Sequence, residues 1–229
     1  MPKNPSKGGR DNFPTPQIYA DEAVRHALTY LPTAPPAAPG VKGLHALEPG
    51  CGANAPFIRA FKDQVPNGTG VCIEKEWWKA PTIQGITPCT GLDFLDDTQD
   101  HVWNPKRGQY DLICTNPPFS VCEKFLEKCF KLLKPEGVMV YLLRLPVLGG
   151  FKRMHIWENR PAIEVTTFVR RISFDGEGTD YSEYGLFYWL GTDLDERYRK
   201  STGQNHMKFS WIDNTSKQLK DGGLRPFGM

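Results

Sequence analysis

The chain has 229 residues and a formal net charge of +2, with 24% charged and 39% hydrophobic residues. This length is enough for a substantial core and fits one domain. No run approaches the ~18 continuous apolar residues of a membrane helix, and residues 1–10 lack the apolar stretch of a secretory signal. We therefore expect a cytoplasmic protein without membrane contact. The small net charge does not by itself indicate a nucleic-acid-binding protein.

Six cysteines are spread along the chain without a C-x-x-C pair. This pattern indicates neither a zinc site nor a disulfide framework, and we expect no metal.

The amino-terminal region divides into a tail and a helix. We expect residues 1–12 to be disordered. Pro16 can begin a helix with Thr15 as its N-cap, and the apolar positions that follow have helical spacing. A stretch rich in proline and alanine, residues 32–40, then leads to the first strand.

A glycine loop follows that strand. The sequence Glu48-Pro49-Gly50-Cys51-Gly52 ends an apolar run, and Asn54 can cap the next helix. Gly50 and Gly52 permit positive φ and close approach of a ligand to the backbone, and the amides at the helix start would face that ligand. These features predict a nucleotide-type cofactor site. Because residues 50–55 also satisfy G-x-G-x-x-A, an NAD(P)-dependent oxidoreductase remains an alternative.

Two acidic residues follow at the ends of further short segments. Glu74 ends a β-branched run about twenty residues past the glycines, the spacing of a carboxylate that binds ribose hydroxyls. Asp93 and Phe94 offer an acceptor and a ring, which suit an adenine amino group and its face. Either acid could instead be a solvated residue beside the core.

The tetrapeptide Asn116-Pro117-Pro118-Phe119 lies between an apolar run and a helix that opens at Ser120, with Ser120 and Glu123 as a capping box. It therefore sits at the carboxyl end of a strand, where open α/β sheets place their chemistry. The prolines make the turn stiff. Such a turn presents two fixed acceptors and a ring, which suit a planar substrate with an NH2 group. The alternative is a rigid turn with its phenylalanine in the core.

Basic residues outnumber acids from Arg144 to Arg171, after a strand at 138–143. We predict a nucleic-acid face on the same side of the sheet as the tetrapeptide, and a solvated loop is the alternative. The candidate substrate contacts are Arg144, Lys152, Arg153 and Arg170.

The carboxyl-terminal part contains two β-rich runs, 165–174 and 184–190, which predict an antiparallel hairpin that closes the sheet. From Gly191 onward the chain is polar. We expect a short helix at most and then a partly disordered tail over residues 193–229.

With these motifs in order, the chain resembles the class I S-adenosylmethionine-dependent methyltransferases that act on amino groups, over roughly residues 10 to 192. Glu48 to Gly52, Glu74, Asp93-Phe94 and the tetrapeptide at 116–119 match the family's four motifs in turn. Phe13-Pro14-Thr15-Pro16 matches the F-x-T-P element of the DNA adenine-N6 enzymes, and the small phage-type members are the most similar.

The resemblance implies an α/β, Rossmann-like fold: a mostly parallel twisted sheet, a closing antiparallel hairpin and helices on both faces. It implies one methyltransferase domain over residues 13–192 with S-adenosyl-L-methionine as cofactor. The implied cofactor-binding residues are Phe13, Thr15, Pro16, Glu48, Gly50, Gly52, Asn54, Glu74, Asp93 and Phe94. DNA is the implied partner, and a homodimer or partner subunit could supply further contacts.

The resemblance also implies roles in catalysis. Asn116 and the Pro117 carbonyl would bind the two N–H groups of adenine N6, Phe119 would stack on the extruded base, and Pro118 would contact the substrate. No large recognition domain is present, so recognition would fall to short loops at 145–160 and 175–183. RNA methylation on adenine N6 or guanine N2, and binding without turnover, remain alternatives.

Overall fold

The structure is a computed structural model that describes residues 13–32, 43–76, 82–103, 105–174, 179, 181–214 and 225–226. The expected tail over residues 1–12 and part of the loop at 175–183 lie outside these residues. Among the helices within these ranges, none is long and apolar enough to cross a membrane.

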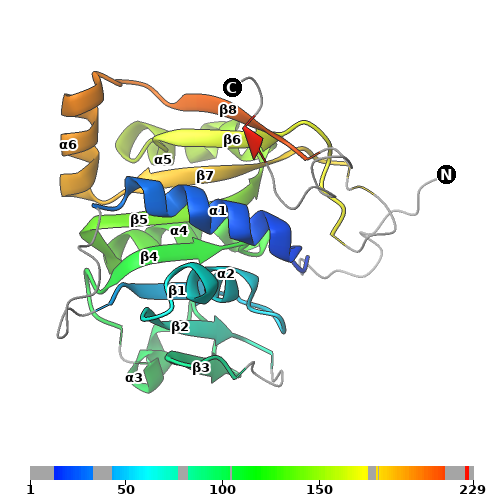
Figure 1. Ribbon diagram of the computed structural model, residues 1–229, viewed down its shortest axis with the longest axis vertical. Coiled ribbons are helices and arrows are strands. Elements are labelled where there is room, and N and C mark those ends of the chain that lie inside the picture. Colours follow the sequence, from blue (N-terminus) through cyan, green and yellow to red (C-terminus); the bar gives the residue numbers. More distant parts are fainter. Residues whose placement is uncertain are drawn as a thin grey trace.

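Strands and helices alternate along most of the chain (Figure 1). The strands are β1 (His45–Pro49), β2 (Thr69–Glu74), β3 (Ile86–Thr90), β4 (Tyr110–Thr115), β5 (Leu133–Arg144), β6 (Glu164–Phe168), β7 (Tyr184–Leu190), β8 (Lys208–Asp213) and β9 (Arg225–Pro226). The α-helices are α1 (Gln17–Tyr30), α2 (Pro56–Gln64), α3 (Asp100–Trp103), α4 (Cys122–Leu132), α5 (Met154–Asn159) and α6 (Thr192–Thr202).

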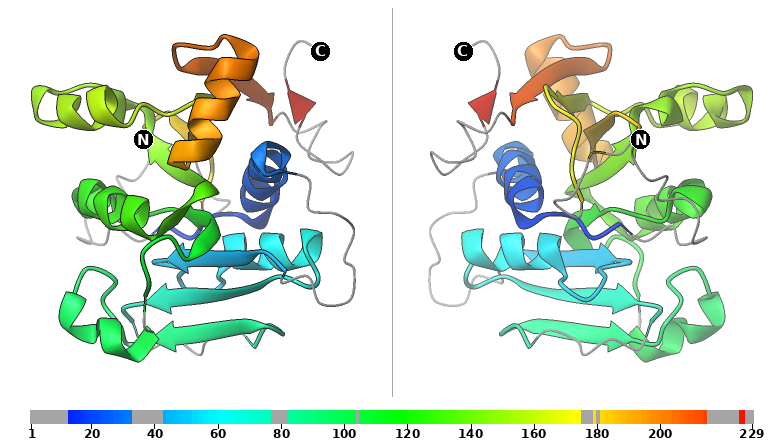
Figure 2. Two further views of the ribbon diagram at one scale, coloured as in Figure 1. Left: turned by 90° about the vertical axis from the view of Figure 1, so that its left-hand side faces the viewer. Right: turned by 90° about the vertical axis from the view of Figure 1, so that its right-hand side faces the viewer.

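These strands form one sheet in the order β3-β2-β1-β4-β5-β7-β6-β8-β9. Strands β1 to β5 pair in parallel, whereas β7 runs antiparallel to both β5 and β6. Helices α1 and α2 lie on one face, and α4 and α5 lie on the other (Figure 2). The predicted Rossmann-like fold, with its closing antiparallel hairpin and helices on both faces, is confirmed.

Burial on both faces explains the composition of the central strands. Strand β7 reads Tyr-Gly-Leu-Phe-Tyr-Trp-Leu and every residue in it is buried, as is Val138 to Leu143 of β5. Continuous apolar runs of this kind are typical of strands covered by helices on both sides. The core consists of two apolar layers, one on each face of the sheet.

The structure differs from the sequence prediction at the carboxyl-terminal side. Strand β6 ends at Phe168, so residues 169–174 leave the sheet earlier than expected. The prediction of a short helix at most after residue 193 is wrong, because β8 follows α6 and pairs in parallel with β6. Ile212 of β8 is 2% exposed and joins the core beside α1.

A buried carboxylate connects α1 to this part of the sheet. Glu164 of β6 is 1% exposed and accepts hydrogen bonds from the Tyr30 hydroxyl and from Ser210 Oγ of β8, and His26 Nε2 lies 3.0 Å from it. Burial would raise the pKa of Glu164, but the hydrogen bonds from His26, Ser210 and Tyr30 outweigh burial and lower it from 4.5 to about 2.

We expect Glu164→Gln to destabilise the protein at neutral pH by about 1–3 kcal/mol, because it weakens a buried charged network. Since the pKa of Glu164 is lower in the folded state, this stabilisation is present above pH 4.5 and is lost as the pH falls towards 2. Urea unfolding should therefore show a difference in the free energy of unfolding between wild type and variant that becomes smaller in acid.

The control for this test is Glu183→Gln, which removes a half-exposed partner of Arg171 and should have little effect. A difference in the free energy of unfolding that stays constant with pH would contradict the role of the ionised Glu164.

Candidate functional site

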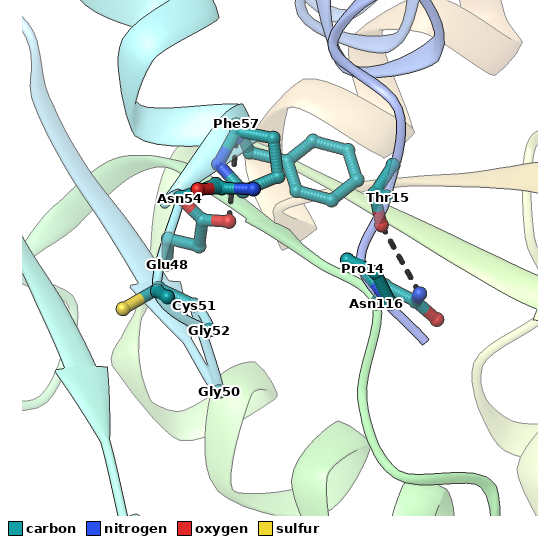
Figure 3. Close-up of a pocket in the computed structure, with 11 residues that line it drawn as sticks. Pro14, Thr15, Glu48, Gly50, Cys51, Gly52, Asn54, Phe57 and Asn116 are labelled. Carbon is teal, nitrogen blue, oxygen red and sulfur yellow. Dashed lines mark hydrogen bonds between the residues drawn. The ribbon is translucent and has the colours of Figure 1, made fainter. Parts of the chain in front are cut away.

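The residues singled out by the sequence gather at the carboxyl ends of β1, β2 and β4. Two cavities meet there and share Gly50 and Asn116 in their walls. The smaller, of about 190 Å³, lies between the loop after β1 and the segment before α1 (Figure 3). The larger, of about 460 Å³, extends over the ends of β2 and β4. Together they make one elongated site.

The loop after β1 has the backbone that its glycines predict. Gly50 and Gly52 have φ values of +68° and +61°. The amides of Gly50 and Cys51 donate to the Ile73 carbonyl at 2.8 and 3.0 Å, so the loop is fixed to the end of β2. A side chain at Gly52 would meet no atom within 4 Å, which leaves the loop open to a ligand.

Glu74 lies directly beside this loop. One oxygen of its carboxylate accepts the Gly52 N–H at 2.7 Å, and the other accepts the Glu76 N–H at 3.1 Å. The side chain is 9% exposed and lines the larger cavity. The structure therefore brings the second predicted acid to the glycine loop, as the spacing of the two motifs indicates.

Glu48 holds the start of α2. Its carboxylate accepts the N–H groups of Ile58 at 2.7 Å and Phe57 at 3.3 Å, and it is 2% exposed. Burial raises the pKa of Glu48 well above its usual value, although both amides act in the opposite direction. It also lines the smaller cavity (Figure 3).

The prediction that Asn54 caps α2 is wrong. The N-cap is Ala55, which has φ +44° and makes no side-chain cap bond, and the first free amides of the helix bind Glu48 instead. Asn54 still lines the smaller cavity, and its carbonyl accepts a hydrogen bond from Arg59.

Asp93 and Phe94 lie at the far side of the larger cavity. Burial would raise the pKa of Asp93, but the ion pair with Lys75 at 2.8 Å and the Leu95 amide outweigh it, so the pKa is lowered. Phe94 is 3% exposed, and its ring packs against those of Trp103 and Phe125. The ring is thus mainly part of the core, and Phe94 also lines the larger cavity.

Asn116 lines both cavities. Its Nδ2 donates to the Phe13 carbonyl at 2.9 Å and to Thr15 Oγ1 at 3.1 Å (Figure 3). Its Oδ1 is buried and has no hydrogen-bond partner among the described residues. A buried acceptor without a partner costs stability and marks a place where a ligand donor fits.

The amino-terminal segment is therefore part of the site. Thr15 is 7% exposed and does not cap α1, because its hydroxyl is used by Asn116; the N-cap position belongs to Pro16 and has no side-chain bond. Pro16 lies beside the smaller cavity, in a third hollow with Asn54.

The rest of the tetrapeptide forms a tight turn. Pro117 is buried, Pro118 lines the larger cavity, and Phe119 begins a short 3-10 turn before α4. The predicted capping box at Ser120 and Glu123 does not form, since α4 starts at Cys122 with no side-chain cap bond.

Phe119 contacts two residues predicted from the sequence, Phe13 and Arg144, and one that was not predicted, Tyr184. Its ring lies 5.9 Å from that of Phe13 and 5.7 Å from that of Tyr184, and the Arg144 guanidinium carbon is 4.3 Å from its centre. Tyr184 and Phe174 flank the loop of the predicted hairpin. This position is the sequence feature that could have indicated them as site residues.

The basic residues after β5 do not form one face. Arg153 Nε donates to the carbonyls of Val147 and Gly149, so it holds its own loop together. Arg170 is exposed, whereas Arg160 lies over the Phe130 ring in a pocket at the opposite, amino-terminal end of the sheet. The side chain of Lys152 lies outside the described residues.

No protein-family model matches the chain, and no curated protein is significantly similar to it. Solved structures are similar at low identity. A protein from Listeria monocytogenes, provisionally assigned as a class I S-adenosylmethionine-dependent methyltransferase, has a TM-score of 0.59 and 10% identity over 86% of this chain and 65% of that one. The chain thus spans less than two thirds of that protein.

Two further structures extend the comparison. A provisionally assigned RNA methyltransferase from Pyrococcus horikoshii has a TM-score of 0.55 and 17% identity over 82% of this chain and 89% of that one. A predicted O-methyltransferase from Agrobacterium tumefaciens has a TM-score of 0.52 and 12% identity over 83% of this chain and 85% of that one. These similarities show that the chain has the fold of class I methyltransferases.

We expect Glu48→Ala to destabilise the protein by about 0.5–2 kcal/mol, because it leaves the first amides of α2 without an acceptor. Glu48→Gln should cost less. Since the pKa of Glu48 is raised in the folded state, the wild type should lose stability relative to Glu48→Gln as the pH rises above 4.5. Thermal unfolding across this pH range checks both statements.

Glu136→Gln, at a half-exposed position paired with Arg197, is the matched control and should show no such trend. A loss in Glu48→Ala no larger than that in Glu136→Gln would contradict the capping role of Glu48.

Proposed function

We propose that the protein transfers a methyl group from S-adenosyl-L-methionine to the exocyclic N6 amine of adenine in DNA. The observation that carries this proposal is the buried, unpaired Oδ1 of Asn116 at the meeting point of two cavities. An acceptor held in this way suits the N–H of an amine substrate. The fold, which is that of class I methyltransferases, supports the same reaction class.

The residues of the site fit such a cofactor. Glu74 lines the cavity with Asp93 and offers carboxylate oxygens to ribose hydroxyls, while Asp93 can accept from an adenine amino group. The smaller cavity, between the open loop at Gly52 and Thr15, suits the amino-acid part of the cofactor. When bound, the cofactor supplies a methyl group on a sulfonium, which is already a good leaving group.

The protein's task in this reaction is to position the amine. The lone pair of an exocyclic amine is delocalised into the ring. Asn116 Oδ1 accepts one N–H and the Pro117 carbonyl accepts the other, which favours a more tetrahedral nitrogen and directs its lone pair at the methyl group. Asn116 itself is held by Phe13 and Thr15, so the orientation of its side-chain oxygen is fixed.

DNA is favoured by the match of Phe13 to Pro16 to the F-x-T-P element, together with the contact of this element with Asn116. A base stacked in a duplex must be extruded to reach the site, and Phe119 provides a ring on which it can stack. The similar structure of a protein provisionally assigned as an RNA methyltransferase favours RNA as the second candidate substrate.

The protein is incubated with isotope-labelled S-adenosyl-L-methionine and, separately, duplex DNA, single-stranded DNA and bulk RNA, and the labelled nucleoside is identified by mass spectrometry. We expect labelled N6-methyladenine in DNA. Label in RNA alone would change the substrate, and no label together with cofactor binding would favour a protein that binds without turnover.

We expect Asn116→Ala to lower the rate of methyl transfer by a factor on the order of 10², because it removes a preorganised acceptor. Asn116→Asp should also lose rate, since a carboxylate has no N–H to donate to Phe13 and Thr15. Single-turnover kinetics with saturating cofactor measures this step.

Asn67→Ala is the matched control, because this exposed residue lies in the turn before β2, at the opposite end of that strand from Glu74. A variant Asn116→Ala with the wild-type rate would contradict the proposed role.

We expect Glu74→Gln to weaken the binding of S-adenosylhomocysteine by a factor on the order of 10 to 100, because a charged acceptor is lost. Glu127→Gln, on the exposed side of α4, should bind as the wild type does. Calorimetric titration gives both affinities. Tight binding of NADH by the wild type would instead favour an oxidoreductase.

A further inference from the structure

Four aromatic side chains beside the tetrapeptide contact one another in a closed cycle, which we call the aromatic box. Phe13 lies 5.9 Å from Phe119, Phe119 lies 5.7 Å from Tyr184, Tyr184 lies 4.9 Å from Phe174, and Phe174 lies 5.4 Å from Phe13, measured between ring centres. The four rings come from separate segments of the chain. Their convergence at one place therefore depends on the tertiary fold.

The aromatic box holds the guanidinium group of Arg144, the last residue of β5. The guanidinium carbon lies 4.3 Å from the centre of the Phe119 ring, 5.5 Å from Phe13 and 5.8 Å from Tyr184. Its Nε donates to the Tyr184 hydroxyl at 3.0 Å. A guanidinium is planar and delocalised, and it stacks on aromatic faces in the way a nucleobase does.

The aromatic box is adjacent to the unpaired acceptor. Phe13 contributes its ring to the box and its carbonyl to Asn116 Nδ2, and Phe119 is only three residues from Asn116. A planar base that stacks on the Phe119 ring face covered by Arg144 has to displace the guanidinium group. The two groups cannot occupy that face together.

We propose that in the free protein Arg144 occupies the position of the adenine base that is to be methylated. It leaves the face of Phe119 when the base enters, an inference that rests on the proposed function. The exchange replaces one planar stacking partner of Phe119 by another of comparable strength. The released guanidinium remains cationic and can pair with a phosphate of the same nucleotide. Arg144 is thus a positioning residue that controls entry of the base.

The test uses adenosine as probe, with S-adenosylhomocysteine saturating so that the cofactor site is filled. Calorimetry compares the wild type with Arg144→Ala, Arg144→Lys and the control Arg197→Ala, which removes an exposed charge on α6. We expect Arg144→Ala to bind adenosine on the order of tenfold more tightly than wild type, because the ring face is already free. Arg144→Lys should be intermediate and Arg197→Ala unchanged.

Equal or weaker adenosine binding by Arg144→Ala, or no adenosine binding by any form, would overturn the inference. A parallel gain in Arg197→Ala would do the same, since the effect would then be one of net charge.

A second measurement uses only the wild type, in case the variants fail to fold. The guanidinium group of Arg144 lies over the Phe119 ring. NMR should therefore show the chemical shift of its Nε–Hε group moving towards that of a solvent-exposed arginine as adenosine is added. A resonance that does not move overturns the inference. Neither measurement needs methyl transfer. Exchange of Arg144 for adenosine without any methylated product would therefore refute the proposed function alone.

Discussion

The side-chain amide of Asn116 joins two parts of the chain that are 103 residues apart. Its nitrogen fixes the segment before α1 to the end of β4, and this leaves its oxygen buried and without a hydrogen-bond partner among the described residues. Because an amide is planar, fixing one atom also fixes the other. The same pair of bonds therefore shapes the wall of the site and orients its acceptor. The remainder of the site is arranged around this point, with the glycine loop on one side and the ring of Phe119 on the other.

The cofactor side of the site depends on a second shared contact. Parallel pairing places Glu48 beside Cys72, so β1 and β2 end at the same level and their loops meet. At that level Glu74 binds the Gly52 amide, and Glu48 binds the start of α2. Both acids satisfy backbone N–H groups of the loop and helix they adjoin. The shape of this region therefore comes from carboxylates as much as from glycines.

The fold and the main positions of the site could be predicted from the sequence, because strand ends and glycine loops are marked by local patterns. The helix caps could not be predicted from the sequence. Asn54 and Thr15 are good capping residues, but the Glu48 carboxylate of β1 accepts the amides of α2, and the Asn116 side chain, just after β4, donates to the Thr15 hydroxyl. Such competition between distant side chains leaves no trace in local sequence. The basic residues after β5 are dispersed for a related reason, since the segment folds into turns and a helix. Strand β8 was missed because its one deeply buried side chain, Ile212, stands among polar neighbours.

Strand β8, in the carboxyl-terminal part of the chain, also determines where the chain can be truncated. It covers the backbone of β6 along five residue pairs, and Ser210 completes the bonding of Glu164. A fragment that stops at residue 192 would leave the N–H and C=O groups of β6 open along that side. Exposed edges of this kind recruit strands from other molecules. The smallest unit that folds without self-association should therefore extend at least to Asp213.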